Sequence, residues 1–383
     1  MLPVPHRHAW MTDEIEMMRD QARRFIEREI APQLERWREQ GRSDPAAWRH
    51  LGEMGLLLPE LPEEFGGAGA TPAHQMVIQD ELARAEVVTG TLGVHSIAAH
   101  YILDYGTDVE KQRWLPRMAS GELLAAIAMT EPGTGSDLQA VRTRAERQGE
   151  HYVIHGAKTF ITGGHNAGLV VIVCKTDAAK GAKGISLIVA EPQGLAGFRV
   201  GRLLDKIGMK ASDTAELFFD DMRVPVANLI GGVEGQGFFQ LMGQLPFERT
   251  QIAVSAVAAA ERALELTVQY TKERKAFGQP VFDFQNTRFK LAECATTVHV
   301  MRCFVNDCIQ RLVDGKLDPE AAYMAKWWCS EQQCKVLDEC LQFFGGYGYM
   351  SEYPIARMYA DARVQKIYGG ANEIMKDLIS RKL

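Results

Sequence analysis

Leu169-Val-Val-Ile-Val-Cys174 and Ile185-Ser-Leu-Ile-Val189 are short runs of apolar, mostly β-branched residues. Similar short runs lie at residues 152–154, 159–161 and 215–219. Gly, Asp, Asn and Pro separate the runs at short spacing, and no helical pattern intervenes, which is typical of strands joined by turns. Residues 126–230 are therefore predicted to form a β domain, an antiparallel barrel or sandwich rather than a series of βαβ units.

Both flanks of this β region have the periodicity of helices. Apolar residues recur at helical spacing within residues 1–125, and long helical stretches follow within residues 231–383. The order helix, sheet, helix predicts an α+β chain. Three domains are expected: an N-terminal α-helical domain at 1–125, a middle β-barrel-like domain at 126–230 and a C-terminal α-helical bundle domain at 231–383.

Composition excludes several classes of function. The chain has 383 residues, 46% hydrophobic and 24% charged, which is the balance of an ordinary globular protein. A formal charge of −6 without a long basic run argues against nucleic acid or an anionic membrane as the main partner. No apolar stretch approaches the roughly 20 residues of a membrane span.

The N-terminal residues 1–10 contain no apolar core of a signal peptide. Seven cysteines, six of them between Cys294 and Cys340, include no CxxC pair and are expected to be reduced thiols. Both observations favour a cytoplasmic location, or the mitochondrial matrix only if a transit peptide has been removed.

Several common catalytic motifs are missing. The sequence has no GxGxxG after a strand, no GxxxxGK[ST], no HExxH and no GxSxG. The ten histidines are scattered without the spacing of metal ligands, so no metal site is expected.

Three stretches remain as candidates for chemistry. Ala128-Met-Thr-Glu-Pro-Gly-Thr-Gly-Ser-Asp137 has free backbone N–H groups and hydroxyls that suit a ring imide or a pyrophosphate. Lys158-Thr-Phe-Ile-Thr162 offers an aromatic wall for a planar cofactor, and Gln342-Phe-Phe-Gly-Gly-Tyr-Gly-Tyr349 lets a ligand approach its backbone. Taken singly, the three equally fit a capped turn, a strand ending in a Gly turn, and a Gly helix cap.

Together, however, these stretches resemble the acyl-CoA dehydrogenase family over nearly the whole chain. The first matches the family pattern A-M-T-E-P-x-x-G-S-D. The third, continued to Asp361, matches Q-x-x-G-G-x-G-Y-x-x-E-x-x-x-x-R-x-x-x-D without a gap. Arg274-Lys-Ala-Phe-Gly278 resembles the family segment R-K-x-F-G.

The resemblance implies an FAD cofactor between the β domain and a C-terminal four-helix bundle. Phe160 stands where the family more often has Trp and keeps an aromatic wall. The contacts from Arg274, Gln285 and residues 342–346 would reach into a neighbouring subunit, which implies a homotetramer built as a dimer of dimers. The implied cofactor contacts are Ile127, Met129, Thr130, Gly135, Ser136, Phe160, Ile161, Thr162, Arg274, Phe277, Gln285, Gln342, Gly345, Gly346, Ala371, Asn372 and Glu373.

The catalytic base departs from the commonest family pattern. Where many members have Y-E-G-T, this chain has Tyr368-Gly-Gly-Ala-Asn-Glu-Ile374, so Gly369 occupies the base position. Glu248, in Gln244-Leu-Pro-Phe-Glu-Arg249, resembles the relocated base of the long-chain and isovaleryl types. Two alternatives remain open: Glu248 is a helix-surface ion-pair former, or Glu373 is the base. Pro246 either starts or kinks the helix that carries Glu248.

The implied reaction is an α,β-desaturation of an acyl-CoA thioester to a trans-2-enoyl-CoA. Glu248 would remove the α-proton, the β-hydride would pass to flavin N5, and the N–H of Gly369 would hold the thioester carbonyl. The expected electron acceptor is an electron-transferring flavoprotein, and the acyl chain itself is not predicted. The implied substrate contacts are Ser136, Phe239, Phe247, Arg249, Gly369 and Gly370.

Two other functions remain open at this stage. One is a flavin oxidase or monooxygenase of the same fold, and the other is a non-catalytic acyl-CoA binding protein.

Overall fold

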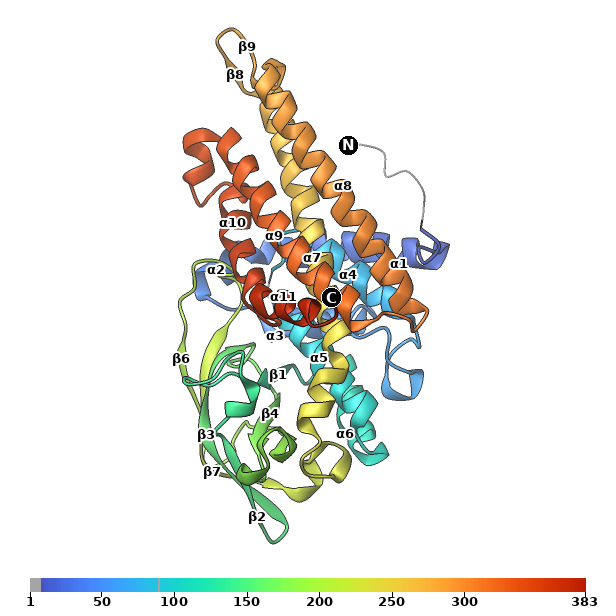
Figure 1. Ribbon diagram of the computed structural model, residues 1–383, viewed down its shortest axis with the longest axis vertical. Coiled ribbons are helices and arrows are strands. Elements are labelled where there is room, and N and C mark those ends of the chain that lie inside the picture. Colours follow the sequence, from blue (N-terminus) through green and yellow to red (C-terminus); the bar gives the residue numbers. More distant parts are fainter. Residues whose placement is uncertain (1–7, 89) are drawn as a thin grey trace.

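The computed structural model describes residues 8–88 and 90–383, so most of residues 1–10, on which the signal-peptide prediction rests, lie outside it. The first region is helical (Figure 1). Its helices are α1 (Asp13–Phe25), α2 (Leu34–Gln40), α3 (Pro45–Glu53), α4 (Pro72–Arg84), α5 (Thr91–Tyr105) and α6 (Asp108–Ala119). Helix α6 begins at a capping box, in which the Thr107 side chain and the Glu110 carboxylate each bond the other's backbone N–H.

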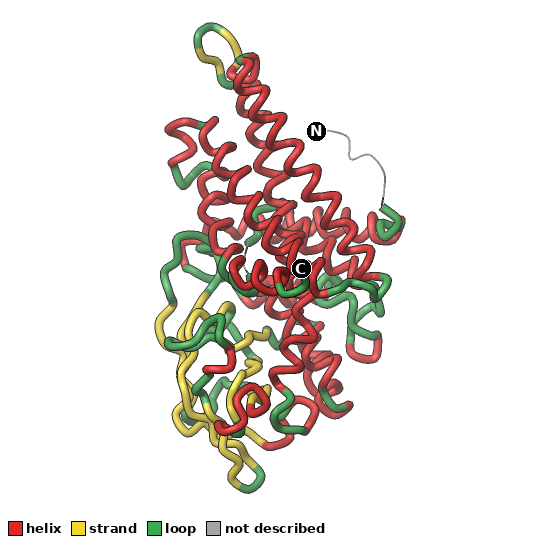
Figure 2. Tube along the Cα trace, viewed as in Figure 1, coloured by secondary structure: helices red, strands yellow, loops and turns green. Residues whose placement is uncertain are grey.

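The middle region is a curled sheet whose strands gather at one end of the molecule (Figure 2). Its strands are β1 (Ala125–Ala128), β2 (Arg144–Gln148), β3 (His151–Thr162), β4 (Leu169–Lys175), β5 (Ile185–Ala190), β6 (Phe198–Leu203) and β7 (Thr214–Pro225). They follow the order β1-β4-β2-β3-β7-β6, and β5 pairs with β4. The predicted β domain is confirmed.

The expectation of a purely antiparallel sheet is wrong. Strand β4 pairs in parallel with β1 and, at one position, with β2. The long connection from β1 to β4 contains the whole β2–β3 hairpin, and a connection of a dozen or more residues allows parallel pairing.

The apolar run 169–174 has no hydrophobic alternation because β4 is buried on both faces. Leu169, Val171 and Val173 pack into the core shared with the N-terminal helices. Val170 and Ile172 pack into the core enclosed by the sheet. A strand covered on both sides reads as a continuous apolar run, which explains why this stretch is so distinctive.

The third region is helical again, as predicted. Its elements are α7 (Gly237–Glu273), α8 (Gln285–Val313), α9 (Pro319–Phe343), α10 (Pro354–Ala362), α11 (Asn372–Ser380) and a hairpin of β8 (Lys275–Ala276) and β9 (Gln279–Pro280). Three long helices pack together, and the short α10 and α11 cover α9. Helix α7 begins earlier than its Ala-rich segment suggested, so Pro246 lies inside it.

Helices α7 and α8 project beyond the rest of the molecule and carry the β8–β9 hairpin at the end opposite the sheet (Figure 1). None of the helices within residues 8–88 and 90–383 combines the length and the apolar character that a bilayer span requires.

A buried ion pair joins the loop after β1 to strand β3. Lys158 is 1% exposed, and its ammonium donates to Glu131 Oε1 at 3.0 Å and to the carbonyls of Met129 at 3.0 Å and Val173 at 2.7 Å. The Glu131 carboxylate also accepts two backbone N–H groups, and Lys158 and these N–H groups hold its pKa below the usual value against the effect of burial. The pair is therefore fully hydrogen-bonded, which a buried pair needs in order to be stable.

Replacing Lys158 should be strongly destabilising. We expect Lys158→Met to lower the free energy of unfolding by about 3–5 kcal/mol, because it leaves Glu131 buried without its cation. Lys210→Met, which removes the surface ion pair with Asp205, should change it by less than about 1 kcal/mol. Denaturant unfolding of the three proteins measures both values, and equal losses in the two variants would contradict the prediction.

Candidate active site

Glu248 lies in the first third of α7, facing α5. Its side chain is buried, and the hydroxyl of Tyr101, a fully buried residue of α5, donates to Glu248 Oε1 at 2.7 Å. Within the described residues, Glu248 forms no ion pair. The alternative that Glu248 is a helix-surface ion-pair former is therefore wrong.

The electrostatics of this carboxyl group suit a proton acceptor. Burial raises the pKa of Glu248, while the Tyr101 hydrogen bond and the charge of Arg249 act in the opposite direction. Burial, and then the Glu248 carboxylate, raise the pKa of Tyr101 well above its usual value, so Tyr101 stays a donor. A carboxylate desolvated in this way is a stronger base than one in water.

Gly369 approaches the same face of α7. Its φ is +62° and that of Gly370 is +89°, both in the region that favours glycine. A Cβ added at Gly369 would lie 2.3 Å from Cδ1 of Ile252, which is one helical turn beyond Glu248. Position 369 therefore presents only backbone, and α7 fills the space that a side chain there would take.

Arg249 reaches the backbone of the same loop. Its Nε donates to the Gly369 carbonyl at 3.4 Å, and its guanidinium lies over the Tyr323 ring, 4.5 Å from the centroid. The same guanidinium also lies next to Gly370: a Cβ added at Gly370 would be 3.4 Å from an Arg249 Nη atom. The two predicted pairs Glu248-Arg249 and Gly369-Gly370, which are about 120 residues apart in the chain, are thus brought together.

The end of this loop is held from inside the protein. The Asn372 side chain is buried and bonded to Lys326 and Ser330, so the predicted cofactor contact at residue 372 does not come from a free side-chain amide. The neighbouring Ala371 is half-buried. Glu373 is exposed in the first turn of α11, which gives its carboxylate none of the burial that strengthens Glu248 as a base.

The first two cofactor stretches form one surface. Thr159 N–H donates to the Thr130 carbonyl at 2.9 Å, which joins the loop after β1 to the end of β3. Phe160 is 67% exposed at a β-bulge with φ +59°, so its ring stands out from the sheet. Of the other predicted contacts here, Gly135 and Ser136 are exposed, Ile127, Met129, Thr130 and Thr162 are half-buried, and Ile161 is buried.

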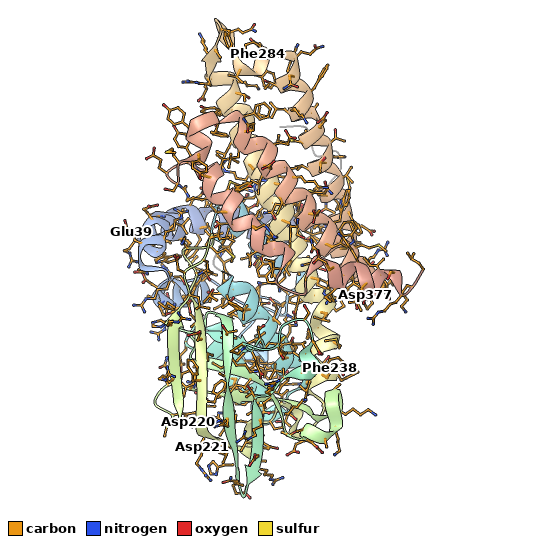
Figure 3. All side chains as sticks on the ribbon, turned by 60° about the vertical axis from the view of Figure 1, so that its left-hand side comes forward. Glu39, Asp220, Asp221, Phe238, Phe284 and Asp377 are labelled. Atoms are coloured by element: carbon orange, nitrogen blue, oxygen red, sulfur yellow. The ribbon has the colours of Figure 1, made fainter. Side chains whose placement is uncertain are left out.

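The remaining predicted cofactor contacts lie far from this surface. Arg274, Gln342, Gly345 and Gly346 line one groove at the other end of the C-terminal helices. Phe277, at the β8–β9 turn, is 97% exposed, and Gln285 is the first residue of α8. Figure 1 shows the β8–β9 hairpin at one end of the molecule and the sheet that contains β3 toward the other end, and Figure 3 labels Phe284, which directly precedes α8, at the end away from the sheet. One chain therefore cannot bring both sets of residues to a single cofactor.

The predicted substrate contacts outside the loop are also divided. Phe247 is buried next to Glu248, with its ring 4.3 Å from that of His100. Phe239 is 67% exposed, packs edge-on against Tyr105, and precedes Glu248 by more than two helical turns. Ser136 belongs to the exposed loop after β1. Of these three, the structure brings only Phe247 to Glu248.

Sequence reasoning missed Tyr101 and Lys326. Tyr101 lies among apolar residues of α5 and Lys326 within an ordinary helical stretch of α9, so neither belongs to a motif. The sequence does contain one indication of them: each is a polar residue on the apolar face of a helix. A polar group buried there needs a hydrogen-bond partner, so it could have been identified as a candidate.

A helical–sheet–helical chain with an exposed aromatic wall, an adjoining Gly-rich loop and a buried carboxylate fits the class that the sequence resemblance implies, a flavin-dependent oxidoreductase. The open backbone at Gly135 and the exposed Phe160 ring fit a flat, phosphate-bearing cofactor. Among the described residues, no group of three His, Cys, Asp or Glu side chains is placed to hold a metal ion.

Comparison with known proteins agrees with this class. The chain matches the family descriptions acyl-CoA dehydrogenase N-terminal, middle and C-terminal domain over residues 12–122, 126–222 and 235–383. It is 45% identical over 375 residues to the long-chain specific acyl-CoA dehydrogenase of mouse mitochondria, covering 97% of this chain and 87% of that protein.

Solved structures give the same result. The crystal structure of an acyl-CoA dehydrogenase from Geobacillus kaustophilus superimposes with a TM-score of 0.96 at 44% identity, covering 98% of this chain and 99% of that one. A glutaryl-CoA dehydrogenase from Mycobacterium smegmatis, solved in complex with FADH2, gives 0.90 at 25% identity, covering 97% and 94% of the two chains. The chain belongs to the acyl-CoA dehydrogenase family, and the predicted FAD-dependent oxidoreductase is confirmed.

The burial of Glu248 should make the stability of the protein depend on pH. Since its pKa is raised in the folded chain above the unfolded value of about 4.3, folding favours the protonated form, and that stability is lost as the pH rises through the folded pKa. Glu248→Gln should therefore raise Tm at pH 8, by about 1–2 °C per kcal/mol recovered in a chain of 383 residues, and raise it less at pH 5.

Thermal unfolding of the holoenzymes at the two pH values measures this difference. Glu373→Gln, which changes an exposed carboxylate, is the matched control and should leave Tm nearly unchanged at both. A Glu248→Gln variant that is less stable than the wild type at pH 8 would show that the carboxylate is not held at a desolvation cost.

Proposed function

We propose that this enzyme desaturates an acyl-CoA thioester to the trans-2-enoyl-CoA, with Glu248 as the base that removes the α-proton. The observation that carries the proposal is the buried Glu248 carboxylate on α7, next to Arg249, which bonds the Gly369 carbonyl, and one turn before Ile252, which packs against the side-chain-free Gly369. A base supplied from this helix accounts for a family base position that holds glycine.

The chain's own groups divide the work of the reaction. The Gly369 N–H donates to the thioester carbonyl and stabilises the negative charge that develops there as the proton leaves. Tyr101 holds the Glu248 carboxylate in place, and the burial of the site excludes water from it. The loop 129–136 with Phe160–Thr162 would hold the cofactor from one chain. FAD, when bound, supplies the acceptor for the hydride that leaves the β-carbon.

An anaerobic titration of the wild-type holoenzyme and of Glu248→Gln with saturated acyl-CoAs tests the proposal. We expect the wild-type flavin to bleach, and we expect the bleaching rate to fall by about 10²–10⁴-fold in Glu248→Gln, the typical contribution of a general base. The variant should still bind the thioester, as measured by calorimetry.

A control variant and two other outcomes distinguish the alternatives. Glu373→Gln should bleach like the wild type; if instead Glu373→Gln loses bleaching and Glu248→Gln keeps it, Glu373 is the base. Binding without bleaching in the wild type would favour a non-catalytic acyl-CoA binding protein. Rapid reoxidation of the reduced enzyme by O₂ would favour an oxidase or monooxygenase.

Tyr101→Phe should change the pH dependence of the reaction. The Tyr101 hydrogen bond lowers the pKa of Glu248, so its loss lets burial raise that pKa further; Arg249 is the other charged group that acts on this carboxyl. The acidic limb of the kcat/KM profile should move to higher pH, with kcat/KM about tenfold lower on that limb, the size expected for one hydrogen bond to a charged group.

Tyr105→Phe is the matched control for this prediction. Tyr105 lies one helical turn beyond Tyr101 on α5 and contacts Phe239 rather than Glu248, so its profile should match the wild type. An unshifted acidic limb in Tyr101→Phe would separate Tyr101 from the base.

We propose that the enzyme acts on long straight-chain acyl-CoAs in fatty-acid β-oxidation. These thioesters are therefore the first to titrate. The similarity to a long-chain specific enzyme supports this order, and the thioester that bleaches the flavin fastest identifies the acyl class. An electron-transferring flavoprotein is proposed as the acceptor; failure of such a protein to reoxidise the reduced enzyme would exclude it.

A cytoplasmic homotetramer, built as a dimer of dimers, is the proposed form of the enzyme. The support is the separation of the two sets of predicted cofactor contacts to opposite ends of the chain, which a second copy reconciles. Sedimentation of the holoenzyme as a monomer would exclude the assembly, and fractionation of the source cells tests the location.

A further inference from the structure

Two buried cations lie beside the Gly369–Gly370 loop. Lys326 of α9 is fully buried and Arg249 of α7 is 4% exposed. In the described part of the chain, neither forms an ion pair with a carboxylate. A buried charge without a counterion is unfavourable unless other polar groups solvate it. These two cations therefore need hydrogen-bond acceptors nearby.

Those partners are backbone carbonyls of the loop. Lys326 Nζ donates to the Gly370 carbonyl at 2.5 Å and to Asn372 Oδ1 at 3.0 Å. Arg249 Nε donates to the Gly369 carbonyl at 3.4 Å. Two consecutive carbonyls are therefore held by cations that come from two different helices.

The Lys326 anchor is itself fixed. Asn372 Nδ2 donates to Ser330 Oγ at 3.0 Å, and Ser330 lies one turn beyond Lys326 on α9. Burial, and then the charge of Arg249, lower the pKa of Lys326 to about 7. The ammonium and the neutral amine both have enough N–H groups for the two acceptors, so the contact persists in either state.

The loop needs such anchors because its own backbone does not define its shape. Gly369 and Gly370 have the largest conformational freedom of any residue type and adopt φ +62° and +89°. With both carbonyls turned toward α7 and α9, the N–H of Gly369 finds no acceptor among the described residues. It is left available to a substrate carbonyl.

We propose that Lys326 is a positioning residue of this enzyme: by holding the Gly370 carbonyl and Asn372, it orients the loop so that the Gly369 N–H is presented to the thioester carbonyl. The inference rests on the proposed function, because it assigns a task to the loop in the desaturation. Lys326 itself does not touch the reacting atoms.

Lys326→Met tests the proposal, since it keeps a long buried side chain and removes the donor. We expect kcat to fall by about 10–100-fold, which is no more than the fall in kcat caused by removing a direct oxyanion donor. KM should change by less than about threefold. The matched control is Lys376→Met, which removes a cation lying over the Trp327 ring at the same contact of α9 with α11.

A second measurement distinguishes positioning from mere stability. The trans-2-enoyl-CoA made from the best substrate, labelled with ¹³C at the thioester carbonyl, is bound to each holoenzyme, and the carbonyl stretch is recorded by infrared difference spectroscopy. In the wild type and in Lys376→Met the band should move to lower frequency on binding, because the carbonyl is polarised; in Lys326→Met that shift should be at least halved.

The outcomes separate the two proposals. If the wild type does not desaturate any acyl-CoA, the proposed function fails. If the wild type does, and Lys326→Met keeps either the wild-type kcat or the full carbonyl shift, the role of Lys326 is refuted and the function stands. If Lys326→Met does not fold, Lys326→Leu, a shorter side chain that also lacks a donor, is judged by the carbonyl shift alone, and a full shift would likewise refute positioning.

Discussion

The ion pair of Lys158 with Glu131 joins three segments that must stay together for the cofactor surface to exist. Lys158 lies on β3 just before Phe160, Glu131 lies in the loop that leads to Ser136, and the Val173 carbonyl comes from β4. The Lys158 ammonium has three acceptors for its three N–H groups, both Glu131 oxygens accept hydrogen bonds, and both side chains are buried. Because the partners come from the loop after β1, from β3 and from β4, the aromatic wall and the Gly-rich loop cannot move apart without exposing an unpaired charge.

The candidate active site divides its requirements between a long helix and a glycine loop. Helix α7 is packed on both the N-terminal helices and the C-terminal bundle, so Glu248 sits on an element that is held from two sides. The loop at Gly369 supplies backbone, and its glycines allow the positive φ angles that a side chain would resist. Placing the carboxylate on α7 thus leaves the loop free to present an N–H group.

The errors and omissions of sequence reasoning have a common cause. The parallel pairing of β1 with β4, the internal position of Asn372 and the contacts of Tyr101 and Lys326 all depend on residues distant in the chain. No local periodicity or motif records such contacts. The start of α7 is a further example. The local sequence does not show whether Pro246 begins or interrupts the helix, because proline is compatible with both; in the structure the helix begins at Gly237.

The sequence by itself determined the order helix, sheet, helix, since hydrophobic periodicity and turn residues act locally. It also determined the candidate loops and the absence of a carboxylate at Gly369, because these are matters of residue type at fixed spacing. Only the tertiary structure decided that Glu248 is buried against Tyr101, and that Lys326 and Arg249 hold the carbonyls beside Gly369. Desolvation and hydrogen bonding between helices set the chemistry of these groups, and both arise only when segments far apart in the chain pack together.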